Sequence, residues 1–322
     1  MRSVSASSPD ALAVAANPPW LGGFPFSNSR RTGSIRIMGT AVLFPGQGSQ
    51  TENMRETVEG NAPELLERCI ELVGEDPFPR VDDSTRFQQP AIFCASMVGW
   101  RWTEPHVEPD AMAGHSLGEL AALAAAGALS EDEALQLVVT RGKLMSEAAE
   151  AQSEGAMLAV LKGTPEQAGE LAESHGVHVA NDNAPGQVVL SGRRSGLEEV
   201  VDAAREAELR TMWLAVAGAF HSPDMEEAAE RFRAELAEVE FSKPTVQVLS
   251  CATAAPFEDP AAQLADALVE PVRWRQTMSA LDELGIDRFI DTGPGKTLAQ
   301  LVARNVSDAR VERAEDLHGA AA

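Results

Sequence analysis

Short apolar runs and longer amphipathic stretches alternate along this chain, and the alternation predicts strands that are followed by helices. Residues 40–44 (Thr-Ala-Val-Leu-Phe) and 109–113 (Pro-Asp-Ala-Met-Ala) are short and mostly apolar, as buried strands are. Apolar residues at helical spacing follow at 54–74. Another helix is predicted from Pro90 to Trp102, with the proline in the first turn. Strands that alternate with helices indicate an α/β fold with a mostly parallel sheet.

The alternation of predicted strands and helices continues before and after residues 155–217. A helix is predicted at 119–126, and another begins after Ser130, where Glu133 three residues later completes a capping box, and runs to Ala151. The later predicted elements are a helix at 222–238, a strand at 245–250, helices at 260–269 and 272–285, a strand at 288–291 and a helix from Lys296.

Residues 155–217 follow a different order. Strands are predicted at 156–161, 177–181, 187–191 and 209–216, and helices at 164–175 and 195–207. This βαββαβ order is that of a ferredoxin-like unit. We therefore expect residues 155–217 to form a small ferredoxin-like subdomain that is inserted into a larger catalytic core, formed by residues 38–154 and 218–322.

Composition excludes several classes of protein. No apolar run approaches the ~20 residues of a membrane span. The three cysteines (Cys69, Cys94 and Cys251) lie far apart, which argues against a disulfide framework and a zinc site and favours the cytoplasm. The six histidines have no metal-binding spacing, and the net charge of −23 argues against nucleic-acid binding. We expect a monomer without a metal or a bound cofactor.

The first 37 residues differ from the rest. They contain four arginines and one acid (Asp10), with many Ser, Pro and Gly residues. This composition is typical of a disordered leader, and organelle transit peptides have a similar one. Met38 directly precedes the first predicted strand, so residues 1–37 are left out of the fold prediction.

Residues 114–118, Gly-His-Ser-Leu-Gly, form the strongest chemical motif in the chain. The pattern G-x-S-x-G is a nucleophile elbow when it joins a strand to a helix, and both elements are predicted here. The glycines allow a sharp turn, and the N-terminus of the following helix favours developing negative charge. Ser116 is therefore a candidate nucleophile.

A nucleophilic serine needs a base, and His221 is the best candidate. It lies in Gly218-Ala-Phe-His-Ser-Pro223, between a predicted strand and helix, whereas we expect His115 to pack or hydrogen-bond within the elbow. No carboxylate is obvious as a third member. Asp291, at the end of a strand, could orient the histidine, and so could a backbone carbonyl.

Two further features bear on a reaction at Ser116. An oxyanion hole needs backbone N–H donors, which Leu117 and Gln47 of the glycine-rich loop 45–50 could supply, although such a loop is also compatible with a plain tight turn. Arg141 lies on the helix opened by Ser130. If buried near the serine, it would bind a carboxylate through two parallel hydrogen bonds, whereas a lone helical arginine is usually solvated.

Together these motifs resemble the malonyl-CoA:acyl carrier protein transacylase family and the related acyltransferase domains of fatty acid and polyketide synthases. The matching pieces are Phe44-Pro-Gly-Gln-Gly-Ser-Gln50, Gly114-His-Ser-Leu-Gly-Glu119, Arg141-Gly with Met145, Asn181 to Gly192, Gly218-Ala-Phe-His-Ser222, Pro271-Val-Arg-Trp274 and Thr292-Gly-Pro-Gly-Lys296. They cover residues 40–298, nearly the whole chain beyond the leader.

The resemblance implies an α/β-hydrolase-like core with a ferredoxin-like subdomain. It implies that Ser116 is the nucleophile and His221 the base, that the N–H groups of Gln47 and Leu117 form the oxyanion hole, and that Arg141 binds the malonyl carboxylate. The implied reaction is ping-pong: malonyl-CoA acylates the serine, and the phosphopantetheine thiol of acyl carrier protein then takes the malonyl group.

Two further residues come from the resemblance alone. In the family a main-chain carbonyl just before the Pro-Val-x-Trp segment orients the histidine, often from a glutamine, and Ala267 stands at that place here. Phe220 resembles the malonyl-selective form of its motif. A bulky ring there would crowd an α-methyl group, which is worth only about 1–3 kcal/mol of discrimination.

Three functions compete at this point. The first is malonyl transfer in fatty acid biosynthesis, with a stand-alone polyketide synthase acyltransferase as a close variant. The second is a serine hydrolase or thioesterase, which would use an Asp or Glu as a triad member and give Arg141 no role. The third is a non-catalytic binding protein, which would not require Ser116, His221 and Arg141.

Overall fold

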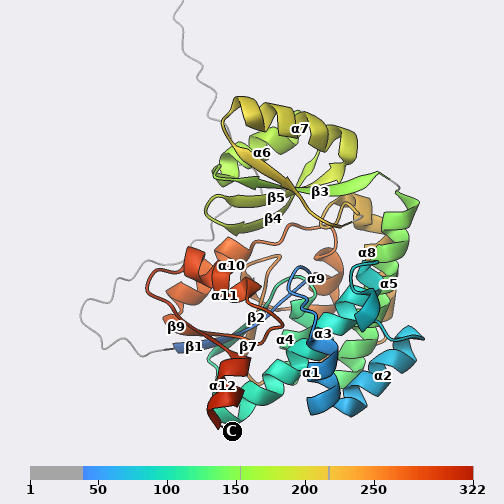
Figure 1. The fold of residues 1–322 in the computed structure, drawn as a ribbon, viewed down its shortest axis with the longest axis vertical. Helices are drawn as coiled ribbons and strands as arrows, with labels where there is room; N and C mark the ends of the chain where they lie inside the picture. Colours follow the sequence, from blue (N-terminus) through green and yellow to red (C-terminus); the bar gives the residue numbers. More distant parts are fainter. Residues whose placement is uncertain (1–38, 153, 217, 322) are drawn as a thin grey trace, which may run out of the picture. The chain divides into compact units, whose positions relative to one another are not determined.

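The computed structural model describes residues 39–152, 154–216 and 218–321, and these form two β-sheets with helices packed around them (Figure 1). The predicted leader, residues 1–37, lies outside the described residues. None of the helices described is long and apolar enough to cross a lipid bilayer.

The larger sheet has six strands in the order β10-β9-β1-β2-β7-β8. Their bounds are Gly39–Phe44 (β1), Ala111–Gly114 (β2), Gln247–Ser250 (β7), Ala255–Pro256 (β8), Ile286–Asp291 (β9) and Arg310–Arg313 (β10). All neighbours are parallel except β7 and β8. The predicted α/β class with a mostly parallel sheet is confirmed.

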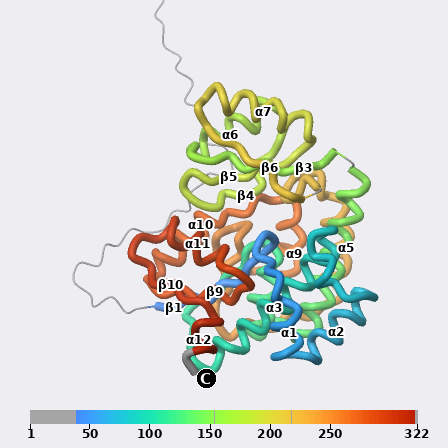
Figure 2. The backbone as a smooth tube through the Cα atoms, in the orientation of Figure 1, coloured from blue at the N-terminus to red at the C-terminus, as the bar shows by residue number. Residues whose placement is uncertain are grey.

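Helices cover both faces of this sheet. Side chains along a strand alternate between its faces, and both faces here carry apolar side chains that must be buried. On β1, Val42 and Phe44 pack into one apolar cluster, and Ala41 and Leu43 pack into another on the opposite face. The helices are α1 (Met54–Asn61), α2 (Pro63–Val73), α3 (Thr85–Thr103), α4 (Gly118–Ala125), α5 (Glu131–Ala151), α8 (Glu226–Leu236), α9 (Pro260–Asp266), α10 (Trp274–Glu283), α11 (Thr297–Asn305) and α12 (Ala314–Ala321). Helix α12 packs against α3 (Figure 2).

Two helix predictions were wrong at their boundaries. The helix expected at 54–74 is two helices, because Ala62 leaves the helical conformation and Pro63 opens α2 as its first residue. Helix α3 begins at Thr85 rather than at Pro90. The Ser84 side chain caps it by accepting a bond from the N–H of Arg86, so the proline lies inside the helix. Strand β10 and helix α12 had no predicted counterpart.

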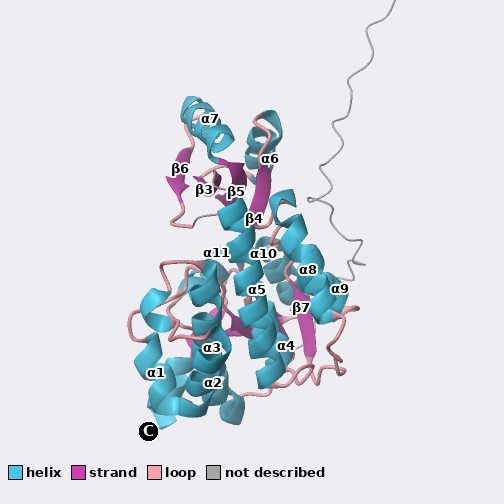
Figure 3. Ribbon diagram, turned by 90° about the vertical axis from the view of Figure 1, so that its right-hand side faces the viewer, coloured by secondary structure: helices cyan, strands magenta, loops and turns pink. Residues whose placement is uncertain are grey.

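The smaller sheet is antiparallel, with the order β4-β5-β3-β6. Its strands are β3 (Gly155–Leu161), β4 (His178–Ala184), β5 (Gln187–Arg193) and β6 (Arg210–Trp213). Helices α6 (Pro165–Ser174) and α7 (Arg194–Glu206) lie on the same side of the sheet (Figure 3). Strand β4 also forms a bridge to the segment before α10, where Asn181 pairs with Val272. This bridge holds one edge of the small sheet against the residues that precede α10.

Candidate active site

Ser116 occupies a tight turn between β2 and α4, and its φ of 54° is in the left-handed region. Both glycines of the motif are required by close backbone approach. A Cβ on Gly114 would lie 2.0 Å from the carbonyl carbon of Gly118, and a Cβ on Gly118 would lie 2.1 Å from the carbonyl oxygen of Phe44. The turn is therefore a nucleophile elbow that presses against the end of β1.

The glycine-rich loop after β1 lies against this elbow. A Cβ on Gly46 would lie 2.4 Å from the carbonyl oxygen of His115. The Gln47 side chain anchors the loop to α3, because its Oε1 accepts a bond from Thr85 Oγ1 at 2.9 Å and its Nε2 donates to Gln88 Oε1 at 2.5 Å. Within the described chain, neither the Gln47 nor the Leu117 backbone N–H has an acceptor.

His221 lies beside the serine, 105 positions away in the sequence. Its Nε2 is 2.9 Å from Ser116 Oγ, and its Nδ1 is 2.9 Å from the Ala267 carbonyl oxygen and 3.2 Å from that of Glu270. A carbonyl only accepts, so Nδ1 carries the proton and Nε2 presents a lone pair to the serine hydroxyl. This is the arrangement that a general base requires.

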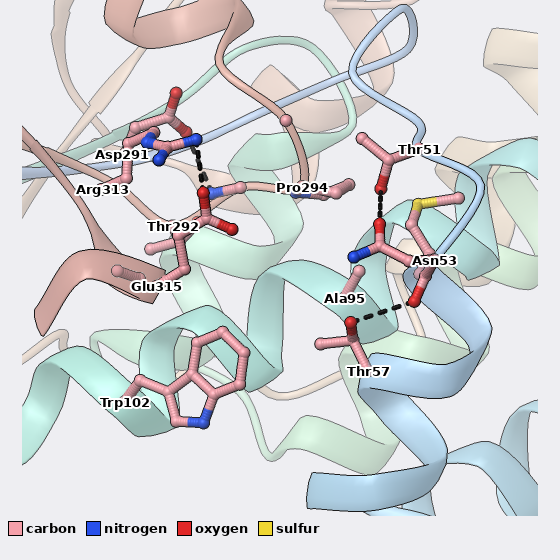
Figure 4. A pocket seen from close by; sticks show the side chains of 14 residues that line it. Thr51, Asn53, Thr57, Ala95, Trp102, Asp291, Thr292, Pro294, Arg313 and Glu315 are labelled. Carbon is pink, nitrogen blue, oxygen red and sulfur yellow. Dashed lines mark hydrogen bonds and ion pairs between the residues drawn. The ribbon is translucent and has the colours of Figure 1, made fainter. Parts of the chain in front are cut away.

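Asp291, the alternative partner for His221, lies elsewhere. Its buried carboxylate accepts bonds from the N–H groups of Gly293 at 3.0 Å and Ala299 at 2.9 Å. It lines a separate cavity of about 180 Å³, together with Arg313 and Trp102 (Figure 4). Backbone carbonyls, rather than a carboxylate, therefore hold the histidine.

The imidazole of His221 is expected to stay neutral in the folded protein down to about pH 5. Burial, with a smaller contribution from the nearby charge of Arg141, lowers its pKa to about 3. Histidine NMR signals, assigned with His221→Gln, should therefore show that the His221 imidazole does not titrate between pH 8 and pH 5. The unfolded chain binds this proton near pH 6.5, so the group lowers the free energy of unfolding as the pH falls below that value. Titration of His221 near pH 6.5 in the folded protein would contradict this.

Arg141 is buried, with 3% of its surface exposed, and it reaches the serine from α5. One guanidinium nitrogen is 3.0 Å from Ser116 Oγ, and another donates to Gln89 Oε1 at 2.8 Å. No carboxylate of the described residues lies within 4.0 Å of it. Burial lowers its pKa to about 10, so it stays charged at neutral pH. No carboxylate occupies its guanidinium edge, which makes Arg141 a candidate for binding an anion.

Ser116, His221 and Gln47 line one cavity of about 250 Å³, together with Phe220, Met145 and residues of β4 and β5. The His115 side chain was expected to pack or hydrogen-bond within the elbow. It instead reaches the small sheet, where its Nε2 is 2.8 Å from Asn183 Oδ1. Gln89 and Asn183 were not predicted as site residues. No local pattern marks Gln89, because it stands next to another glutamine, Gln88, ahead of the predicted helix.

This geometry suits acyl transfer through a covalent serine adduct, because a serine hydroxyl, a neutral histidine and free backbone N–H donors meet in one cavity. Among the residues described, no group of three or more His, Cys, Asp or Glu side chains is arranged to hold a metal ion.

Comparison with known proteins also indicates an acyl transferase. Residues 69–320 match the family model of the acyl transferase domain. A polyketide biosynthesis malonyl CoA-acyl carrier protein transacylase, BaeC of Bacillus velezensis, is 36% identical over 279 residues, which cover 81% of this chain and 95% of the relative. The malonyl CoA-acyl carrier protein transacylase of Haemophilus influenzae is 34% identical over 300 residues, 86% of this chain and 95% of the relative.

Solved structures of malonyl CoA-acyl carrier protein transacylases resemble this chain as well. The malonyl CoA-acyl carrier protein transacylase of Coxiella burnetii has a TM-score of 0.83 at 30% identity and covers 90% of this chain and 98% of that one. The chain therefore belongs to the acyl transferase family, and within that family to the malonyl CoA-acyl carrier protein transacylases.

Proposed function

We propose that this protein transfers the malonyl group of malonyl-CoA to the phosphopantetheine thiol of acyl carrier protein through a malonyl-serine intermediate. The observation that carries the proposal is Arg141, a buried cation with no carboxylate in direct contact, 3.0 Å from the Ser116 hydroxyl. A substrate whose free carboxylate is one methylene away from its reacting carbonyl would place an anion against this guanidinium.

The first half-reaction acylates the serine. Ser116 Oγ attacks the thioester carbonyl carbon while His221 Nε2 takes the hydroxyl proton. The N–H groups of Gln47 and Leu117 stabilise the oxyanion. The carbon–sulfur bond then breaks, and coenzyme A leaves as a thiol with the proton from His221. The Ala267 carbonyl, 2.9 Å from Nδ1, keeps the histidine in the tautomer that this step needs.

The second half-reaction reverses these roles. His221 takes the proton of the carrier-protein thiol, and the sulfur attacks the malonyl-serine ester. The serine oxygen leaves and recovers the proton, so the enzyme returns to its starting state. Phe220 lines the cavity and is 6% exposed, so its ring would crowd a substituent on the malonyl α-carbon.

We also propose a division of the chain into two parts, an oligomeric state and a compartment. Residues 38–154 and 218–322 form an α/β-hydrolase-like catalytic core, and residues 155–217 form a ferredoxin-like subdomain, which the antiparallel order β4-β5-β3-β6 supports. The enzyme acts as a cytoplasmic monomer, without metal, nucleic acid or membrane. Three buried, unpaired cysteines support a reducing compartment.

We place the reaction in fatty acid biosynthesis. A stand-alone polyketide acyltransferase is the second candidate. It is favoured by two relatives at 36% identity, the polyketide biosynthesis malonyl CoA-acyl carrier protein transacylases of Bacillus velezensis and Bacillus subtilis. A malonyl CoA-acyl carrier protein transacylase of Bacillus subtilis, whose name carries no polyketide label, is also 36% identical, so identity alone does not separate the two pathways.

Intact-protein mass spectrometry after brief incubation with malonyl-CoA, without carrier protein, tests the proposal. We expect a mass gain of one malonyl group, no comparable gain with acetyl-CoA, and loss of the adduct when phosphopantetheinylated carrier protein is added. Accumulation of free malonate and coenzyme A without an adduct would instead indicate a hydrolase. No adduct and no turnover would favour a binding protein or another acyl donor.

A further inference from the structure

A second buried ionisable group, Glu119, lies under the elbow and has no role in the proposed mechanism. Burial raises its pKa to about 7, so its carboxyl group is ionised at pH 8 to 9. Glu119, in the first turn of α4, is 1% exposed. No basic side chain of the described residues lies within 4.0 Å of its carboxylate. Buried carboxylates are rare unless they are paired, because burial in an apolar surrounding disfavours the charge. Its position therefore calls for a physical reason.

The contacts of Glu119 lead to the nucleophile. Its Oε1 accepts a 2.7 Å bond from the backbone N–H of Cys251, just after β7. The Cys251 Sγ in turn accepts a bond from the backbone N–H of Ser116, with nitrogen and sulfur 3.4 Å apart. The Glu119 carboxylate is thus linked to Ser116 through Cys251, and it also interacts electrostatically with Arg141.

The two buried charges offset each other without forming a direct ion pair. The negative charge of Glu119 raises the pKa of Arg141, and the positive charge of Arg141 lowers that of Glu119, each against a larger effect of burial. A carboxylate in direct contact would occupy the guanidinium edge. Because Glu119 bonds to the Cys251 backbone instead, the Arg141 nitrogens remain directed at Gln89 and Ser116.

We propose that Glu119 is a positioning residue, the resident counter-charge of Arg141. It stabilises the buried guanidinium in the free enzyme and sets how tightly Arg141 holds the substrate carboxylate. The inference rests on the proposed function. When the malonyl group binds, a second negative charge enters the region, so Glu119 weakens carboxylate binding and favours release of the malonyl group to the acceptor.

The sign of this effect separates it from a purely structural role. Glu119→Gln keeps an oxygen that can accept the bond from Cys251 but removes the charge. The proposal predicts, at pH 8 to 9, that the KM for malonyl-CoA falls by about 3- to 10-fold, since interaction energies between neighbouring residues have this size. The KM for acetyl-CoA should not change. A structural role predicts an unchanged or raised KM for both substrates.

A double-mutant cycle tests the charge coupling without substrate. Glu119→Gln should lower the unfolding temperature by several degrees, and adding Arg141→Gln should recover most of that loss, because the buried cation is then removed too. If Glu119→Gln alone does not fold, the double variant should. Additive losses, or a double variant that fails to fold, would overturn the inference.

Two controls complete the experiment. Cys251→Ala removes the sulfur contact with Ser116 and the interaction of the thiol with Glu119, but it keeps the backbone N–H that binds Glu119 and the carboxylate charge, so the malonyl-CoA KM should not fall. A lower KM in this variant would assign the effect to packing and overturn the inference. If the wild-type protein forms no malonyl adduct, the proposed function fails, and the double-mutant cycle still decides whether Glu119 and Arg141 are coupled.

Discussion

Ser116→Ala is expected to abolish the malonyl adduct and to lower acyl transfer by about 10⁴- to 10⁶-fold, as loss of a nucleophilic serine does in other enzymes. The hydroxyl accepts a bond from Arg141 and contacts His221 Nε2 at 2.9 Å, and alanine has no atom that can attack the thioester. The measurement is the rate of malonyl transfer to carrier protein, together with the intact mass after incubation with malonyl-CoA.

The matched control is Ser195→Ala, at an exposed serine of α7. This variant should keep wild-type activity and the malonyl adduct. Ser116→Ala should remain folded, because removal of a small hydroxyl leaves the elbow glycines in place. A Ser116→Ala protein that transfers malonyl at the wild-type rate would rule out every mechanism with a serine intermediate.

Arg141→Ala is expected to lower kcat/KM for malonyl-CoA by about 10²- to 10³-fold, since removal of one partner of a buried, hydrogen-bonded charge pair costs about 2–5 kcal/mol. The substrate carboxylate would then enter a buried site without a cation. Acetyl-CoA has no carboxylate, so its kcat/KM should not fall with that of malonyl-CoA. The preference between the two substrates, measured by competition, should therefore be largely lost.

Two variants make this result specific to the guanidinium. Arg141→Lys should recover only part of the malonyl preference, because an ammonium group cannot bind a carboxylate through two parallel bonds. Arg205→Ala, at a side chain of α7 that is 74% exposed, should behave as wild type. If Arg141→Ala keeps the malonyl-CoA rate, the proposed carboxylate site is wrong, and the hydrolase alternative gains support.

Local features of the fold were predictable because they depend on residues that are close in the sequence. The capping box of α5 is confirmed: Ser130 Oγ accepts a bond from the N–H of Glu133, and the Glu133 carboxylate accepts one from that of Ser130. The elbow was predictable for the same reason, since five consecutive residues determine its turn. Predictions failed at Pro63 and Pro90, because the same residue can open a helix or lie inside one.

The sequence by itself therefore determined the α/β class, the elbow and the chemical types of its side chains. Only the tertiary structure decided which groups meet. Ser116 lies 25 positions from Arg141, 105 from His221 and 135 from Cys251, and the contacts come from strand order and helix packing. It also decided that a carbonyl holds the histidine and that Asp291 lines another cavity. Local patterns cannot specify such contacts, because burial and pairing depend on the whole fold.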